Sequence, residues 1–88
     1  MIGSLTGTIS GQRNGRIVLK VGDVGYLVSV RSPFDFKEME KVTLHTYLAV
    51  RENALDLYGF LTYDELTLFE ELITLPKIGP KTALQILI

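Results

Sequence analysis

The sequence lacks cysteine altogether and has a single histidine among its 88 residues. Without cysteine there is neither a disulfide framework nor a thiolate metal site, and a reducing compartment is the simpler expectation. No run of residues approaches 18 consecutive apolar positions, and the N-terminus does not have the pattern of a secretory signal peptide. These absences predict a cytoplasmic protein that does not enter a membrane.

An excess of positive charge is also missing. Nine Lys and Arg against ten Asp and Glu give a formal net charge of −1. Residues 1–61 carry seven basic and six acidic side chains, a net +1, and residues 62–88 carry two and four, a net −2. A nucleic-acid-binding protein of this composition cannot rely on a strongly basic surface, so it must use localised contacts and several copies of the chain.

The sequence offers little for catalysis. The lone His45 lies in a strand pattern with no cysteine or second histidine to share a metal ion, and we interpret it as a surface or interface residue. The carboxylates of Asp64 and Glu65, and of Glu70 and Glu71, are direct neighbours on a helix, where they do not converge. No phosphate-binding Walker loop or dinucleotide fingerprint occurs. We therefore expect no catalytic residue, no metal ligand and no cofactor.

The first sixty residues have the alternating pattern of β-strands. Strands are predicted over residues 2–10, 16–21, 26–31, 42–50 and 54–60, separated by turns rich in glycine, asparagine and aspartate. Gly3 and Gly7 share the apolar face of the first strand, which predicts sharp coiling or close approach by another backbone. Residues 33–36 predict a short helical turn or loop packed by its two phenylalanines. The pattern favours a mainly β fold, a five-stranded OB-fold barrel, with an SH3-like barrel as the alternative.

Helical signals begin only after the last strand. Thr62 and Glu65 form a capping box for a helix over residues 62–74, whose apolar stripe is Leu66, Phe69, Leu72 and Ile73. A second helical run starts at Pro80 and is still apolar at Ile88, without a glycine cap or a basic last turn. This ending predicts that the chain is the N-terminal fragment of a longer protein.

The connection between the two helices has the pattern of a phosphate-binding site. Pro80 suits the first helical position, and Gly79 leaves the helix amides open to approach. Unpaired amides and the positive end of the helix dipole attract an anion, and Lys77 and Lys81 add positive charge beside them. The pattern resembles the helix-hairpin-helix module that grips DNA backbones without reading sequence, whereas a plain connector is the alternative. The candidate DNA-binding residues are Lys77, Ile78, Gly79, Pro80, Lys81 and Thr82.

Several stretches, in order and with matching spacing, resemble the RuvA family of Holliday-junction-binding proteins. They are MIGSLTG at residues 1–7, GDVGY at 22–26, VRENA at 50–54, LYGF at 57–60, TLFEELI at 67–73 and IGPK at 78–81. The resemblance implies that residues 1–61 are an OB-fold barrel that forms the tetramer and the junction centre. It implies that residues 62–88 are the first helix-hairpin-helix of a truncated second domain.

The same resemblance implies partners and a role. The family binds four-way DNA junctions as a homotetramer, with an octamer as a further form, and serves the ATP-driven motor RuvB in branch migration. The resolvase RuvC is a further partner, and no membrane is involved. The chain itself would be a DNA-binding subunit of recombination, DNA repair and the SOS response rather than an enzyme, with the ATPase in RuvB.

The family also has an acidic pin at the junction centre, normally Glu followed by Asp. The matching residues here are Glu52 and Asn53, so the second acid is absent. The resemblance implies that pin carboxylates repel the crossing phosphates and disfavour continuous duplex at that point. Two other readings remain at this stage: a fragment of a DNA-repair enzyme that carries a helix-hairpin-helix, and an OB- or SH3-like module that binds only protein.

Overall fold

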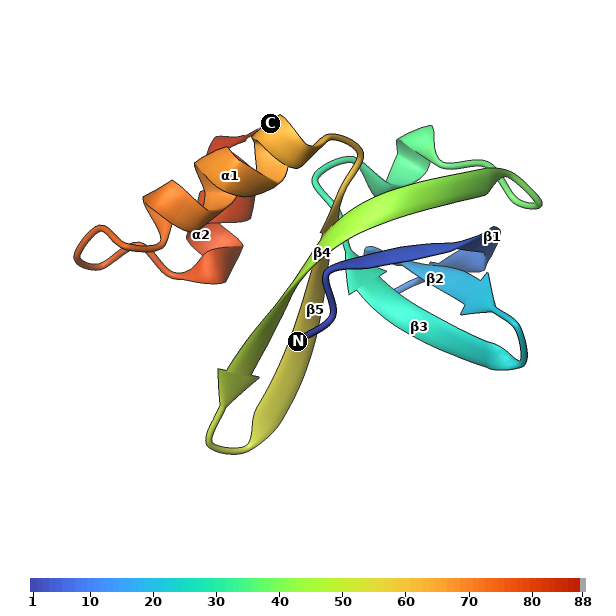
Figure 1. Ribbon diagram of the computed structural model, residues 1–88, viewed down its shortest axis with the longest axis horizontal. Coiled ribbons are helices and arrows are strands. Elements are labelled where there is room, and N and C mark those ends of the chain that lie inside the picture. The colour runs from blue at the N-terminus through green and yellow to red at the C-terminus, as the bar shows by residue number, and fades with distance from the viewer. Residues whose placement is uncertain (88) are drawn as a thin grey trace.

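The computed structural model describes residues 1–87, and it contains five strands followed by two α-helices (Figure 1). None of its helices is long and apolar enough to span a membrane within those residues. The elements are β1 (Ser4–Arg13), β2 (Arg16–Val21), β3 (Val24–Ser29), the 3-10 helix η1 (Pro33–Asp35), β4 (Lys41–Arg51), β5 (Ala54–Phe60), α1 (Tyr63–Leu72) and α2 (Pro80–Ile86).

The five strands form a closed barrel in the order β1-β2-β3-β5-β4. All neighbours are antiparallel except β3 and β5, which pair in parallel through Val28 with Leu57 and Ser29 with Tyr58. This is the OB-fold barrel, and both the fold class and the number of strands agree with the prediction from sequence. The barrel interior is filled by Ile9, Ile17, Leu19, Val28, Val30, Leu44 and Leu57.

The two tight turns make β1 end later and β3 begin earlier than the sequence pattern predicted. Asn14 and Gly15 both have positive φ, 54° and 75°, so two residues suffice to reverse the chain. β1 therefore runs to Arg13, where the pattern predicted a loop from residue 11. β3 likewise begins at Val24, because Gly22, with φ of 61°, allows the preceding turn to close within two residues.

Gly7 is the position at which another backbone approaches closely, as the glycines in the first strand predicted. A Cβ atom built on Gly7 would lie 2.2 Å from the backbone oxygen of Lys20 in β2. Gly3 has nothing within 4 Å of such an atom, so only one of the two glycines is required by its neighbours. The short helical turn or loop expected over residues 33–36 is a 3-10 helix over Pro33–Asp35, but Phe34 is 84% exposed and of the two phenylalanines only Phe36 packs against the barrel core. The prediction that both phenylalanines pack was wrong for Phe34.

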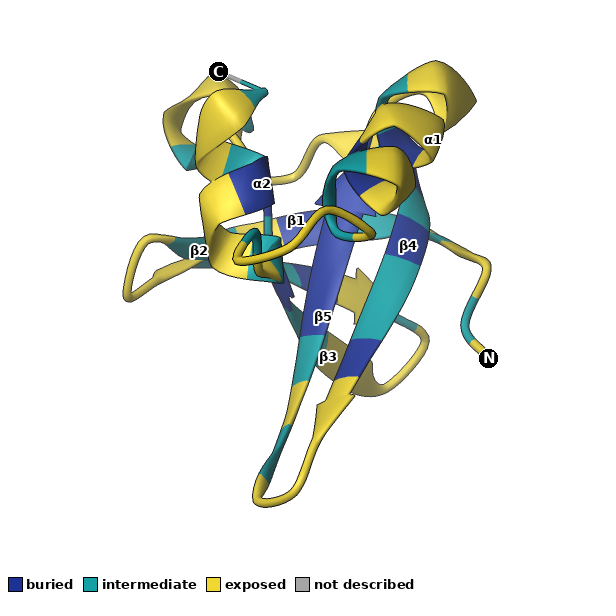
Figure 2. Cartoon of the chain, turned by 90° about the vertical axis from the view of Figure 1, so that its left-hand side faces the viewer, coloured by how far each residue is buried: buried dark blue, intermediate teal, exposed yellow. Residues whose placement is uncertain are grey.

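A second apolar cluster fastens the helices to the outside of the barrel. It comprises Ala49, Tyr58, Phe60, Leu66, Phe69 and Ala83. Phe69 of α1 is fully buried, and its ring centroid lies 4.8 Å from that of Phe60, 5.3 Å from Tyr58 and 5.5 Å from Tyr47. Figure 2 shows α1 over the upper part of β4 and β5, with α2 to one side, and the lower end of the two strands exposed. The two faces of β5 therefore pack into different cores: Leu57 into the barrel interior, and Tyr58 and Phe60 into the second cluster.

The predicted capping box forms at the start of α1, with one difference. The Glu65 amide donates to Thr62 Oγ1 at 3.2 Å, as expected. The Thr62 hydroxyl in turn donates to Glu65 Oε1 at 3.1 Å, so the glutamate meets the hydroxyl and not the backbone amide of Thr62. The helix ends at Leu72, two residues before the predicted end, and the predicted helical position of Ile88 lies outside the described residues.

Candidate nucleic-acid interface

The connection between α1 and α2 presents an open helix start. Gly79 is the N-cap residue and Pro80 occupies the first turn, where its missing N–H is not needed. The Ala83 amide donates to the Gly79 carbonyl at 2.9 Å, and this is the first bond of the helix. The amides of Lys81 and Thr82 precede that bond and therefore have no acceptor within the helix. They are available to an anion.

The side chains around this helix start suit the same purpose. Lys77, Lys81 and Thr82 are exposed, whereas Ile78 turns inward and packs against the second cluster. Lys77 has a φ of 68°, an unusual conformation for a lysine, and it closes the turn before Ile78. Gly79 has a φ of −89° and nothing within 4 Å of a built Cβ. Internal packing therefore does not require glycine there, and its effect is to leave the amides uncovered.

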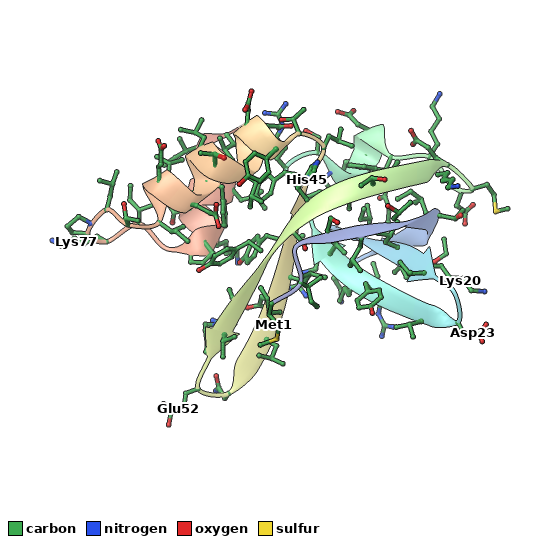
Figure 3. All side chains as sticks on the ribbon, in the orientation of Figure 1. Met1, Lys20, Asp23, His45, Glu52 and Lys77 are labelled. Carbon is green, nitrogen blue, oxygen red and sulfur yellow. The ribbon has the colours of Figure 1, made fainter. Side chains whose placement is uncertain are left out.

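The candidate pin residues stand on a separate projection. β4 and β5 pair as far as Arg51 with Ala54, and Glu52 and Asn53 form the exposed turn between them. Figure 3 shows Glu52 at the end of this hairpin and Lys77 at the outer tip of the helices. Within residues 1–87 the ion pairs involve other acids, so the Glu52 carboxylate carries its charge uncompensated at the tip.

A groove of about 640 Å³ lies between the barrel and α2. Gly79, Pro80, Lys81 and Thr82 line it from the helix, so the candidate phosphate-binding residues form one of its walls. The ionisable lysine, arginine and acidic side chains that line it are Arg16, Arg31, Arg51, Lys81 and Asp56, four basic and one acidic. A chain of net charge −1 thus gathers four of its nine cations in one place.

Two of those arginines are held by other parts of the protein. Arg31 Nε lies 3.1 Å from Glu65 Oε2, and its Nη1 donates to the Leu87 carbonyl at 2.6 Å. Arg51 Nη2 donates to Asp56 Oδ2 at 2.6 Å. These contacts tie the barrel to the helices and stiffen the β4–β5 hairpin, but they also reduce the positive charge that the groove presents.

Tyr58 lines the groove, and the charged side chains around it affect the pKa of its hydroxyl. Burial raises the pKa of its hydroxyl above the ordinary value and the Asp56 carboxylate raises it further, whereas Arg51 and Arg16 lower it. The hydroxyl is therefore neutral at physiological pH, and Asp56, Arg51 and Arg16 line the same groove as Tyr58. Sequence reasoning missed Arg16, Arg31 and this arrangement, because no local pattern relates residues that are far apart in the chain.

The remaining candidates for chemistry are not brought together. His45 is half-buried and packs edge-on against Tyr63, with ring centroids 5.9 Å apart. Over residues 1–87 there is no group of three His, Cys, Asp or Glu side chains that could hold a metal ion. Glu70 and Glu71 are exposed on α1.

The fold and the site together define a class: an OB-fold barrel that carries an exposed helical hairpin of the helix-hairpin-helix pattern on its outer face. Comparison with known families is more specific. The chain belongs to the family described as the RuvA N terminal domain, whose model matches residues 1–59.

Relatives match beyond the barrel. The chain is 44% identical over 88 residues to a protein of Halothermothrix orenii, 42% over 87 residues to one of Tropheryma whipplei and 44% over 90 residues to one of Methylibium petroleiphilum. Each bears the name Holliday junction branch migration complex subunit RuvA. The alignments cover 99% of this chain but 45%, 45% and 47% of those proteins, so the chain spans about half the length of the curated relatives it matches.

Proposed function

We propose that this chain is the junction-binding part of a Holliday junction branch migration complex subunit. It binds four-way DNA junctions by their shape and charge, without reading base sequence, and holds them open. The observation that carries the proposal is the match of 99% of the chain to relatives of that name. The two separate projections, one with open amides and lysines and one with an acidic tip, support it.

Residues 77–82 are proposed to hold the phosphate backbone. The amides of Lys81 and Thr82 donate to phosphate oxygens, and the ammonium groups of Lys77 and Lys81 add charge. Gly79 and Pro80 keep the approach open, and Ile78 anchors the turn to the second cluster. Contacts of this kind carry no sequence information, as a protein that must move along DNA requires.

Glu52 is proposed to act at the junction centre. Its carboxylate repels phosphates, so a continuous duplex is disfavoured where an open junction leaves room. Asn53 is neutral and adds no repulsion. One carboxylate for each copy gives a weaker pin than two would, and a tetramer would present four.

Assembly and partners belong to the same proposal. Copies of the chain form a homotetramer, or an octamer, through the barrel of residues 1–61, and residues 62–88 belong to a second domain. The exposed Val50 and Leu55, which pair across the hairpin at 66% and 68% exposure, are suited to contacts between copies. The chain is not itself an enzyme. The ATP-driven motor RuvB and the resolvase RuvC act on the junction it holds, in the bacterial cytoplasm.

A gel-shift comparison tests the function. A four-way junction and a linear duplex of equal length are titrated at 0.1 M salt, with this chain and with the chain extended by the remaining residues of the Halothermothrix relative. We expect the extended chain to prefer the junction. Equal affinity for both DNAs would contradict junction recognition, and binding to neither would contradict DNA binding.

Replacing Lys81 by alanine should weaken junction and duplex binding alike. Each phosphate contact contributes about 0.9 to the slope of log K against log salt, so losing one lowers the slope by about 0.9 and affinity about eightfold at 0.1 M relative to 1 M salt. Titrations at several salt concentrations measure both. Lys20→Ala is the matched control, because Lys20 is exposed on β2 and lies across the molecule from Lys77 (Figure 3). Binding insensitive to both Lys77 and Lys81 would refute the phosphate contact.

Replacing Glu52 by glutamine should tighten binding to linear duplex and leave junction binding nearly unchanged. Repulsion between two unit charges about 5 Å apart in water corresponds to about a fourfold effect. The measurement is the ratio of junction to duplex affinity, which should fall. Glu38→Gln removes an exposed acid from the η1–β4 connection, away from the hairpin, and should leave the ratio unchanged. An unchanged ratio for Glu52→Gln would remove the pin from the proposal.

A further inference from the structure

The groove between the barrel and α2 is not explained by the contacts at the helix start alone. Lys81 lies on the helix wall of the groove. The other three cations come from the barrel side: Arg16 from β2, Arg51 from β4 and Arg31 from the segment after β3. A structural role accounts for Arg31, which binds Glu65 and the Leu87 carbonyl, and for Arg51, which binds Asp56. Arg16 on β2 has no ion pair within residues 1–87, and it lines the groove from the barrel side.

We propose that this groove is a second phosphodiester-binding site, in which Arg16 of the barrel and Lys81 of α2 bind the backbone of one DNA strand from two sides. The proposal rests on the proposed function, because it extends the path of a strand already held at residues 79–82. Those residues form the groove's helix wall, so the phosphates next to the one they bind pass over Arg16.

The chemistry of the site favours a polyanion with regularly spaced charges. The groove gathers four cations in a chain of net charge −1, and its acid, Asp56, is already bound to Arg51. Arginine also suits phosphate in particular, because its planar donors can bind two oxygens together.

Asp56 limits how much charge the groove can offer. It holds Arg51 at 2.6 Å and cancels one positive charge at the barrel wall. Asparagine in its place would keep the size of the side chain and free the guanidinium for phosphate. The site therefore predicts two changes of opposite sign: loss of affinity when Arg16 is neutralised, and gain when Asp56 is.

The test titrates the 88-residue chain with a 16-base-pair duplex between 0.05 and 0.2 M salt, following amide and arginine side-chain signals by NMR, which detects binding at millimolar DNA. Arg16→Gln should weaken binding up to about eightfold at 0.1 M salt and lower the salt slope by about 0.9. Asp56→Asn should tighten binding up to about eightfold and raise the slope by a similar amount. Lys20→Gln, on the same strand but outside the groove, should change affinity less than twofold.

The two proposals fail in different ways. If the amides of residues 79–82 shift with DNA and Lys81→Ala weakens binding, while Arg16→Gln behaves like Lys20→Gln, the phosphate contact stands and the groove site is wrong. A loss of affinity on Asp56→Asn would also overturn the groove site. No binding at millimolar DNA would overturn both.

A poly-glutamate peptide of equal charge serves as the competitor: if it binds as tightly as the duplex at the same salt, the groove takes an acidic polypeptide and the assignment to DNA is wrong.

Discussion

Phe69→Ala is expected to lower the free energy of unfolding by about 3–5 kcal/mol, the range for removing a buried phenylalanine. Phe69 is fully buried, and its ring contacts those of Tyr47, Tyr58 and Phe60. The surrounding rings belong to β4 and β5, which pair with each other in the barrel. Urea unfolding followed by circular dichroism measures the change. The loss is large against the 5–15 kcal/mol that holds a typical domain together.

This substitution also tests how the candidate DNA contacts are positioned. The second cluster packs α1 and α2 on the barrel, so the positions of the turn at residues 77–82 and of the groove both depend on Phe69. Leu68→Ala is the control, since Leu68 is the neighbouring residue on the same helix and is 47% exposed. It should cost about 0.5 kcal/mol or less. If the two variants are equally stable, the helices are not held by this cluster.

Gly7→Ala is expected to destabilise the barrel by about 3 kcal/mol, the upper part of the usual range for overpacking. The added methyl group would lie 2.2 Å from the Lys20 carbonyl oxygen and 2.9 Å from a Val21 methyl. The first of these is a backbone atom, so relief requires β1 and β2 to move apart and lengthen their hydrogen bonds. Thermal unfolding measures the effect.

Gly3→Ala provides the comparison for that result. Both glycines were placed on the same apolar face by sequence, but nothing lies within 4 Å of a Cβ at Gly3. Its replacement should change stability by less than about 0.5 kcal/mol. A similar loss at both positions would mean that chain flexibility, and not contact with β2, determines the effect of Gly7.

Much of the fold was predictable because its signals are local. Alternation along the strands, the Asn14-Gly15 turn and the capping box of Thr62 and Glu65 each depend on residues a few positions apart. The turn with the open helix start was predictable for the same reason, since Lys77 to Thr82 are contiguous in sequence. Their binding of DNA stays a prediction.

One error arose where distant contacts decide the outcome. Phe34 was expected to pack, yet it is exposed, and of the two phenylalanines Phe36 packs against the barrel core. The error at the end of the first strand had a local cause instead: the turn at Asn14 and Gly15 needs only two residues, so pairing with β2 continues to Arg13.

The sequence by itself determined the strands, the helices, the open helix start and the acidic tip at Glu52, because each is set by residues that are neighbours in the chain. Only the tertiary structure determined that a groove forms and which residues line it. Arg16 and Lys81 are 65 positions apart, 81 less 16, and they line the same groove because the second cluster packs the helices against the barrel. It also decided which arginines are available, because the ion pairs of Arg31 and Arg51 form between segments that only folding brings together.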